Sequence, residues 1–200
     1  MSELVHIMFD WDDTLYPSTW INLINKNVLR VETVKMSIIL ANIEEIILDI
    51  FMKYKDQITI ITNSDRGWVS ISASYYYPRV AHYLQKNSIK IIYAKDCYKK
   101  AGSSRAKWKA NAMIDIIKSQ NIKFKKPSHC IIGFGDQPHD RSAIFLTQEN
   151  IKIFAKSIKF LEKPTAEELH HELKLVSETI DDIMHYPEHL DLMLTVEHLS

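Results

Sequence analysis

Two carboxylates, Asp10 and Asp12, follow a short apolar run and are the residues best suited to chemistry in this sequence. Side chains two residues apart at the end of a strand point to the same side, so both carboxylates would reach one site. Such a pair can transfer a phosphoryl group, because one carboxylate can attack phosphorus while the other exchanges protons with the leaving oxygen and with water. Taken alone, the motif could equally be a solvated acidic turn.

Further polar groups follow other apolar runs. Thr62 and Asn63 come after a run rich in β-branched residues, where a hydroxyl and free amide hydrogens can hold a phosphoryl oxygen, although such residues are also ordinary in turns and helix caps. Asp136 and Asp140 follow another run. A phosphoryl group flanked by carboxylates also requires a compensating positive charge, and a lysine is the expected source.

The elements that must position these groups alternate along the chain. Strands are predicted from apolar and β-branched runs at Leu4–Phe9, Gln57–Thr62, Lys90–Ala94, His129–Phe134 and within Ile151–Leu161. Helices are predicted near 36–54, at Asp65–Leu84 with a break at Pro78, at Arg105–Gln120, at Pro138–Thr147 and from Thr165, with a helical tail over about 177–200.

Strands separated by helices predict an α/β fold, because parallel pairing needs long crossover connections that place helices on both faces of the sheet. We therefore expect a Rossmann-like three-layer sandwich with a central, mostly parallel five-stranded sheet. With no repeat or Gly/Ser linker, residues 1–200 are predicted to form one domain, with a small flap at about 16–36. In such sheets ligands bind beyond the carboxyl ends of the strands.

Residues 10–15, DWDDTL, resemble the D-x-D-x-T motif that opens the haloacid dehalogenase (HAD) superfamily of hydrolases. The resemblance implies that Asp10 is the nucleophile and a metal ligand. It implies that Asp12 is the general acid/base and lends a backbone carbonyl to the metal, and that Thr14 steadies the loop near the substrate. Thr62 matches the second motif of the superfamily, with Asn63 beside it as a substrate-binding residue.

The segment Gly133–Asp140 resembles the closing G-D-x-x-x-D motif of the same superfamily. The resemblance implies that Asp136 binds magnesium, and that Asp140 supports the site by a second contact or through a metal-bound water, which suits an ion that retains several waters. The run Arg105–Lys109 resembles a Trp-Lys pattern of some eukaryotic relatives. That pattern favours Lys109 over Lys107 as the lysine of the site.

These motifs together predict a Mg²⁺-dependent phosphohydrolase that works through an aspartyl phosphate. The intervals 10–62 and 62–109 leave no room for a large cap, so the expected substrate is a phosphoprotein or another accessible phosphomonoester. One alternative is a catalytically silent scaffold, which the intact carboxylates oppose because buried like charges destabilise a fold without their metal. Another is phosphonate or haloacid cleavage, and Asp12 makes phosphate chemistry the better match.

Composition limits the partners. Lys+Arg and Asp+Glu number 25 each, so no excess of positive charge favours nucleic acid or an anionic membrane. The longest apolar stretch, Met36–Phe51, is interrupted by polar residues and predicts an amphipathic helix rather than a membrane span. Two distant cysteines, Cys97 and Cys130, are expected to be plain thiols. With no recognisable secretory signal, these features predict an intracellular, cytoplasmic protein.

Some other residues admit two interpretations. Tyr75, Tyr76 and Tyr77 could stack on bases, but they fit better as aromatic cover for the end of a helix. His139 lies inside the last motif and could touch the substrate or assist proton transfer, although a loop histidine needs no such role. The remaining histidines lack the compact spacing of a zinc site.

Overall fold

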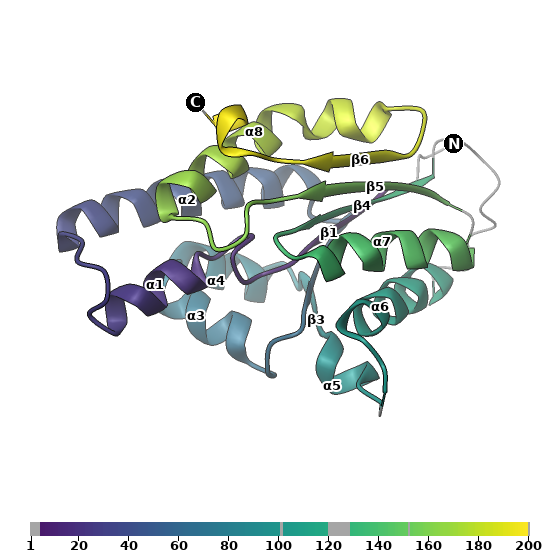
Figure 1. The fold of residues 1–200 in the computed structure, drawn as a ribbon, viewed down its shortest axis with the longest axis horizontal. Helices are drawn as coiled ribbons and strands as arrows, with labels where there is room; N and C mark the ends of the chain where they lie inside the picture. Colours follow the sequence, from purple (N-terminus) through teal and green to yellow (C-terminus); the bar gives the residue numbers. More distant parts are fainter. Residues whose placement is uncertain (1–4, 101, 120–128, 152, 200) are drawn as a thin grey trace.

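The sheet has six strands among the residues that the computed structural model describes, which are 5–100, 102–119, 129–151 and 153–199. Three residues of predicted elements lie outside the described residues. They are Leu4, the first residue of a predicted strand, Gln120, the last residue of a predicted helix, and Lys152, within the segment expected to hold a strand. The strands are β1 (Val5–Phe9), β2 (Ile58–Thr62), β3 (Lys90–Tyr93), β4 (Cys130–Gly135), β5 (Phe154–Lys159) and β6 (Leu190–Met193) (Figure 1).

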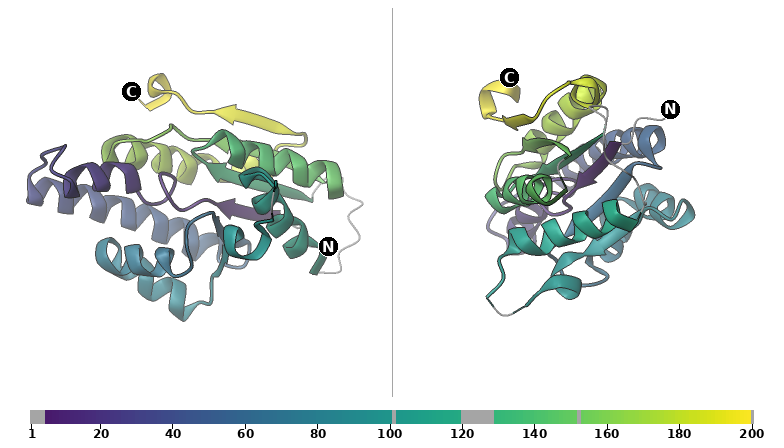
Figure 2. Two further views of the ribbon diagram at one scale, coloured as in Figure 1. Left: turned by 60° about the horizontal axis from the view of Figure 1, so that its bottom comes forward. Right: turned by 90° about the vertical axis from the view of Figure 1, so that its right-hand side faces the viewer.

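The helices connect successive strands and lie on both faces of the sheet (Figure 2). They are α1 (Ser18–Asn25), α2 (Thr33–Tyr54), α3 (Trp68–Tyr76), α4 (Pro78–Lys86), α5 (Ala94–Tyr98), α6 (Arg105–Ser119), α7 (Pro138–Ile151) and α8 (Ala166–His185), with a short 3-10 helix, η1 (Val196–Leu199). The expected break at Pro78 separates α3 from α4, because a proline is favourable as the first residue of a helix and unfavourable inside one.

The predicted α/β class and Rossmann-like three-layer sandwich are confirmed. The strands follow the order β3-β2-β1-β4-β5-β6, and each neighbouring pair is parallel. Alternate residues of β1 enter two hydrophobic clusters, since Ile7 and Phe9 pack toward α2 and α8 whereas Met8 packs toward α6 and α7. This alternation explains why a continuous apolar run forms a strand that is buried on both faces.

The predicted strand count of five is wrong, because the segment expected to be a helical tail contains β6. Helix α8 ends at His185, and Pro187 disfavours a helical conformation for Tyr186 before it. The chain then returns along the sheet edge, where Leu190–Met193 pair with Lys156–Lys159. An exposed strand of four residues has no buried apolar run, so sequence periodicity gave no signal for it.

The strand order places β1 between β2 and β4, at the centre of the sheet. After β1 the chain turns toward β2 and β3, and after β4 it turns the other way toward β5 and β6. The two sets of connections diverge between β1 and β4, which leaves a crevice at the carboxyl ends of these strands. Asp10 and Asp136 lie at this crevice.

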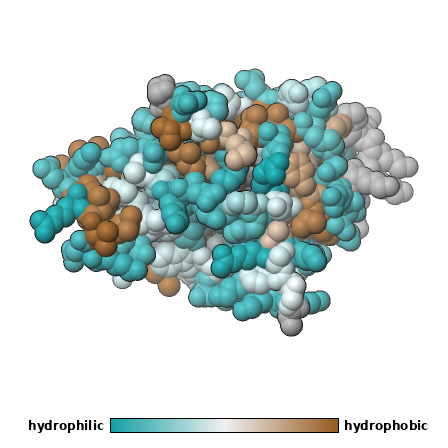
Figure 3. All heavy atoms as spheres, in the orientation of Figure 1, coloured by the Kyte–Doolittle hydropathy of each residue, from teal (hydrophilic) through white to brown (hydrophobic). Residues whose placement is uncertain are grey.

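The surface is mixed in character. The face drawn in Figure 3 is mainly hydrophilic, with hydrophobic side chains in separate patches. Exposed apolar side chains include Val28, Val34 and Ile38, around the start of α2. Among the described residues, no helix combines the length and the apolar character needed to cross a bilayer.

Glu172 is a buried acid in α8. Its side chain is 0% exposed, Oε1 accepts a hydrogen bond of 2.7 Å from the backbone N–H of Leu161, and Oε2 has no hydrogen-bond partner among the described residues. Burial raises the pKa of Glu172 to about 8, assisted by the charges of Glu168 and Asp136 and opposed by the Leu161 N–H and by Lys159. The protonated form is therefore favoured at neutral pH.

Glu172→Gln is expected to remove a pH dependence of stability. The pKa of Glu172 is about 8 in the folded state and lower, at about 4.3, in the unfolded state, so the folded state binds the extra proton between these values. Wild-type stability should consequently fall as pH rises, by about 1.4 kcal/mol per pH unit from this group, whereas a neutral glutamine has no such loss. Urea unfolding at pH 5, 6.5 and 8 measures the difference.

The control for this experiment is Glu178→Gln, an exposed position on the same helix. Its stability should follow that of the wild type at all three pH values. If Glu172→Gln shows no gain over the wild type between pH 5 and pH 8, Glu172 is ionised in the folded protein.

Candidate active site

The carboxyl ends of β1 and β4 lie side by side because the two strands are in register. Phe9 pairs with Phe134, and the backbone N–H of Asp10 donates a hydrogen bond of 2.9 Å to the carbonyl of Phe134. Phe9 also pairs with Ile60 of β2, so Thr62 ends its strand at the same edge. Three of the predicted polar positions are therefore brought together by strand pairing alone.

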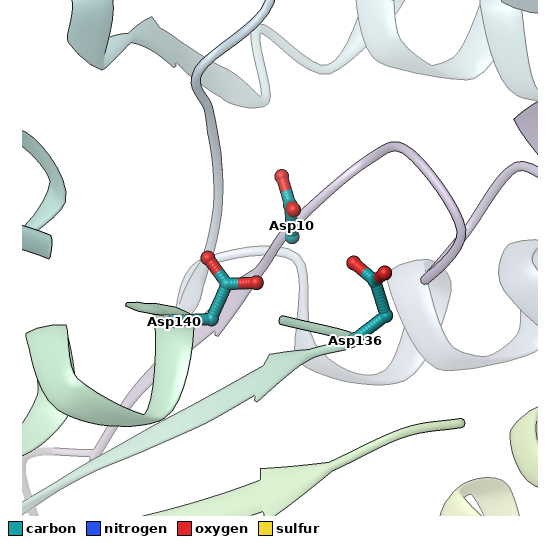
Figure 4. Close-up of side chains that lie close together, drawn as sticks. All are labelled: Asp10, Asp136 and Asp140. Carbon is teal, nitrogen blue, oxygen red and sulfur yellow. The ribbon is translucent and has the colours of Figure 1, made fainter. Parts of the chain in front are cut away.

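Three aspartates form a compact, buried cluster at this edge (Figure 4). Asp10 follows β1, Asp136 follows β4, and Asp140 lies in the first turn of α7; one carboxylate oxygen from each lies within 4.8 Å of the others. Burial raises the pKa of Asp10 well above its usual range, although Lys109 opposes this shift, and burial raises the pKa of Asp136 to about 7. Carboxylate oxygens are the ligands that hard divalent cations prefer, so this cluster could hold a metal ion.

Lys109 supplies the positive charge beside the cluster. Its Nζ lies 2.9 Å from Oδ1 of Asp10 and 2.5 Å from Oδ1 of Asp140, and the residue is 1% exposed. Burial alone would lower the pKa of Lys109, but the two carboxylates outweigh burial and raise it, so the lysine stays charged. Lys107, the other candidate, is exposed, and the structure therefore brings Lys109 rather than Lys107 to the site.

Asp140 is held in place by the turn that opens α7. Its backbone N–H donates to the carbonyl of Gln137 at 2.9 Å, and its Oδ2 accepts from the Gln137 N–H at 3.1 Å. Gly135 allows this close approach, since a Cβ there would lie 2.5 Å from the Cβ of Asp140. The amide side chain of Gln137 in turn hydrogen-bonds Oδ2 of Asp136. A glycine before Asp136 is thus a packing requirement of the cluster.

Both carboxylate oxygens of Asp12 have partners that the sequence did not predict. Trp68 Nε1 donates to Oδ1 at 2.8 Å, and the Ser64 hydroxyl donates to Oδ2 at 2.5 Å. Gly67, with φ of +88°, forms the left-handed turn that leads into α3 and precedes Trp68. The Gly67-Trp68 pair was visible in the sequence, but nothing in the pattern connected it to a carboxylate 56 residues earlier.

The neighbouring Asp13, to which no role was assigned from sequence, anchors the segment after the loop. Its Oδ1 accepts hydrogen bonds from the Thr19 N–H at 2.8 Å and from the Ser18 hydroxyl at 3.2 Å. Its Oδ2 accepts from the Thr19 hydroxyl. Asp13 itself has φ of +52°, a conformation that aspartate tolerates better than most residues. These bonds tie the start of α1, within the predicted flap, to the loop that carries Asp10 and Asp12.

Two predicted substrate-binding residues have unsatisfied polar groups. Both side-chain polar atoms of Asn63 are buried without a hydrogen-bond partner among the described residues, and so is the hydroxyl of Thr14. Buried polar atoms are nearly always paired, so the unpaired amide of Asn63, which lines a cleft, indicates a place for a ligand or water. The Thr62 hydroxyl already accepts a hydrogen bond of 3.0 Å from the Ser64 N–H.

A cleft of about 540 Å³ opens over these groups. It is lined by Asp10, Asp12, Asp13, Thr62, Asn63, Ser64, Lys95, Lys99, Arg105, Trp108, Asp136, Gln137 and His139. His139 Nε2 lies 3.7 Å from Oδ1 of Asp140, and burial is the main reason that the pKa of His139 is lowered, with smaller contributions from Lys109 and Arg105. The imidazole is therefore neutral at pH 7.

The structure brings most of the predicted site residues together and leaves one apart. Five line the cleft, namely Asp10, Asp12, Thr62, Asn63 and Asp136. Lys109 and Asp140 do not line it, but Lys109 contacts both Asp10 and Asp140, and Asp140 belongs to the same cluster as Asp10 and Asp136. Thr14 is fully buried within its loop and does not line the cleft.

The chain matches no protein-family model, and neither a curated protein nor a solved structure matches it.

Proposed function

We propose that this protein is a Mg²⁺-dependent phosphohydrolase of the HAD superfamily, with Asp10 as the nucleophile. The observation that carries the proposal is the buried cluster of Asp10, Asp136 and Asp140, within 4.8 Å of one another and joined to Lys109. Buried like charges are costly, so a buried cluster of carboxylates indicates a bound cation or a catalytic site. The resemblance of DWDDTL to the opening motif of the superfamily supports the same assignment.

Asp10 and Asp12 divide the chemistry in this proposal. A carboxylate oxygen of Asp10 forms a bond to phosphorus, the ester P–O bond breaks, and its electron pair goes to the leaving oxygen, which takes a proton from Asp12. Water then attacks phosphorus of the aspartyl phosphate, and Asp12 accepts a proton from that water. The bond between phosphorus and the Asp10 oxygen breaks, its electron pair returns to the Asp10 carboxylate, and inorganic phosphate leaves. Ser64 and Trp68 orient Asp12 through its two carboxylate oxygens.

The other groups bind and neutralise the phosphoryl oxygens. The side-chain amide of Asn63, which has no hydrogen-bond partner among the described residues, would donate to one of them. Lys109 offsets the negative charge gathered around Asp10. Asp10 and Asp136 would hold Mg²⁺ with the backbone carbonyl of Asp12, and Asp140 would act through a second contact or a water. The bound ion would supply the remaining positive charge as phosphate approaches the carboxylates. The proposed substrate is a phosphoprotein or another accessible phosphomonoester.

Asp136→Asn is expected to abolish the response to magnesium. Purified wild-type protein should hydrolyse 4-nitrophenyl phosphate with Mg²⁺ and lose at least about 100-fold of this rate in EDTA, because the charge of the metal is needed at the reacting phosphate. At about 100 times its Kd, Mg²⁺ should also stabilise the folded wild type by about 2.7 kcal/mol. The variant should show neither effect, as measured by phosphatase assay and thermal unfolding.

The matched control is Asp56→Asn, the same change at an exposed position in the connection between α2 and β2. It should keep both the rate and the stabilisation by Mg²⁺. If Asp136→Asn responds to Mg²⁺ as the wild type does, the assignment of Asp136 as a metal ligand is wrong. Stabilisation by Mg²⁺ without hydrolysis of any phosphomonoester would instead favour the catalytically silent scaffold.

A further inference from the structure

The cleft has an uneven distribution of charge. Its lining includes the buried carboxylates of Asp10, Asp13 and Asp136, together with the exposed cations Lys99 and Arg105 and the half-buried Lys95. These cations come from α5, from the connection after it and from the start of α6. Residues 95–107 contain five cationic side chains and one acidic side chain, in a chain whose total charges balance. The positive charge at the cleft is therefore local.

Two of the three cations form no salt bridge with any residue that the structure describes. Lys95 Nζ lies 2.5 Å from Oδ1 of Asp65, and nearby Asp96 pairs with Arg66. Within the part of the chain that the structure describes, neither Lys99 nor Arg105 makes a salt bridge, and both are exposed. Lys95 is the main cause of a lowered pKa at Asp65, and Lys99 lies near enough to contribute, but this carboxyl is already paired with Lys95. An exposed cation beside a cleft that forms no salt bridge with a described residue is available to an anion from solution.

The position of Arg105 adds to this argument. Arg105 is the first residue of α6, and the first turn of this helix contains no acidic residue. A cation at the positive end of a helix is unfavourable for folding, whereas an anion bound there is favourable. The arginine therefore gives the isolated fold no electrostatic benefit at this position.

The reacting phosphate has a separate source of positive charge. Lys109 is 1% exposed and forms ion pairs with Asp10 and Asp140. Its positive charge therefore lies beside the carboxylate that would attack phosphorus. Lys99 and Arg105 lie on the exposed part of the cleft. A volume of about 540 Å³ lies within the range of ordinary ligand pockets, so the cleft has room for a leaving group that extends beyond its phosphate.

We propose that Lys99 and Arg105 bind a second anionic group on the leaving group of the substrate. The preferred substrates are then phosphomonoesters that carry another phosphate or a carboxylate, and esters of neutral alcohols are poorer substrates. This inference rests on the proposed phosphohydrolase function. A small bisphosphate and a phosphopeptide with acidic neighbours share this chemistry, so the experiment includes both sources.

The experiment compares matched substrates that differ in one anionic group. The sugar pair is glucose 1,6-bisphosphate and glucose 6-phosphate, and the peptide pair is a phosphoserine peptide with aspartate or with alanine beside the phosphoserine. Release of phosphate with Mg²⁺ gives kcat/KM for each. We expect the wild type to favour the more anionic member of at least one pair by about tenfold or more, mainly through KM, and the preference to shrink as salt screens the exposed charges.

The variants are Arg105→Gln and the double variant Lys99→Gln/Arg105→Gln. The double variant should reduce the preference to about twofold or less, with most of the loss falling on the more anionic substrate. Lys118→Gln is the matched control, because it removes one positive charge from α6 at a position about 20 Å from Arg105, at 1.5 Å per residue. This variant should keep the preference for the more anionic substrate. The responding pair identifies the source as a small molecule or a peptide.

Two outcomes overturn the inference separately from the proposed function. The first is that the wild type hydrolyses 4-nitrophenyl phosphate and both substrate pairs but does not prefer the more anionic member of either pair. The second is that the variants lose equal activity toward both members of a pair. Either outcome would overturn the inference and leave the proposed phosphohydrolase function standing. Absence of phosphate release from every probe would overturn the proposed function, and the inference with it. Thermal unfolding of each variant shows whether a loss of activity arises from misfolding instead.

Discussion

Asp10→Asn is expected to lower the hydrolysis of 4-nitrophenyl phosphate by about 10⁴-fold or more, because the amide keeps the shape of the carboxylate but cannot attack phosphorus. The variant should still fold. Its side-chain oxygen can accept the bond that Asp10 Oδ1 takes from the Trp11 N–H at 2.8 Å, and the change removes one of three buried negative charges. Steady-state rates with Mg²⁺, beside thermal midpoints in EDTA, measure both effects.

The thermal midpoint of Asp10→Asn in EDTA should be at least equal to that of the wild type. This expectation follows from the burial of Asp10, which disfavours the charged carboxylate and raises its pKa, whereas the amide carries no charge. Asp56→Asn changes an exposed residue that is not part of the site, so it should leave the rate unchanged. Equal rates in the wild type and in Asp10→Asn would attribute the hydrolysis to a contaminant and remove Asp10 from the proposed role.

Lys109→Met is expected to destabilise the fold by about 3–5 kcal/mol, because it leaves the carboxylates of Asp10 and Asp140 buried without their cation. Methionine has a similar length and flexibility, so little of the loss should come from packing. The rate of phosphate release should fall by about 10²-fold or more, since a positive charge beside the reacting group is lost. Urea unfolding at pH 7 and phosphatase assays measure the two losses.

Lys107→Met is the control for this change, on the same helix and two residues earlier. Lys107 is exposed, so its replacement should alter stability by no more than about 0.5 kcal/mol. Mg²⁺ should restore part of the stability of Lys109→Met, because a divalent cation can neutralise the same carboxylates. A Lys109→Met protein as stable as Lys107→Met would show that the buried pair is not formed in solution.

Much of the fold could be predicted because its signals are local. Each of β1, β2 and β4 is a continuous buried apolar run, and each is followed by a helix, which is the pattern of a parallel sheet covered on both faces. The break at Pro78 was visible for the same reason, since proline acts on the residues directly beside it. The sixth strand was missed because β6 is short, exposed and at the sheet edge, where no apolar period marks it.

The candidate site was only partly predictable. Asp10, Thr62 and Asp136 could be placed together from sequence, because the carboxyl ends of adjacent parallel strands meet at one edge. The choice between Lys107 and Lys109 could not be derived from charge or spacing alone. It depends on which face of α6 packs against the sheet, and that packing buries Lys109 and exposes Lys107.

By itself, the sequence determined the α/β architecture and the residue types available at the strand ends, since both depend on periodicity and on neighbours in the chain. Only the tertiary structure decided the partners: Trp68 and Ser64 on Asp12, Lys109 between Asp10 and Asp140, and the exposed Lys99 and Arg105 at the cleft. Hydrogen bonds and ion pairs act over a few ångströms. Residues 31 to 99 positions apart come within that range only when helices and strands pack together.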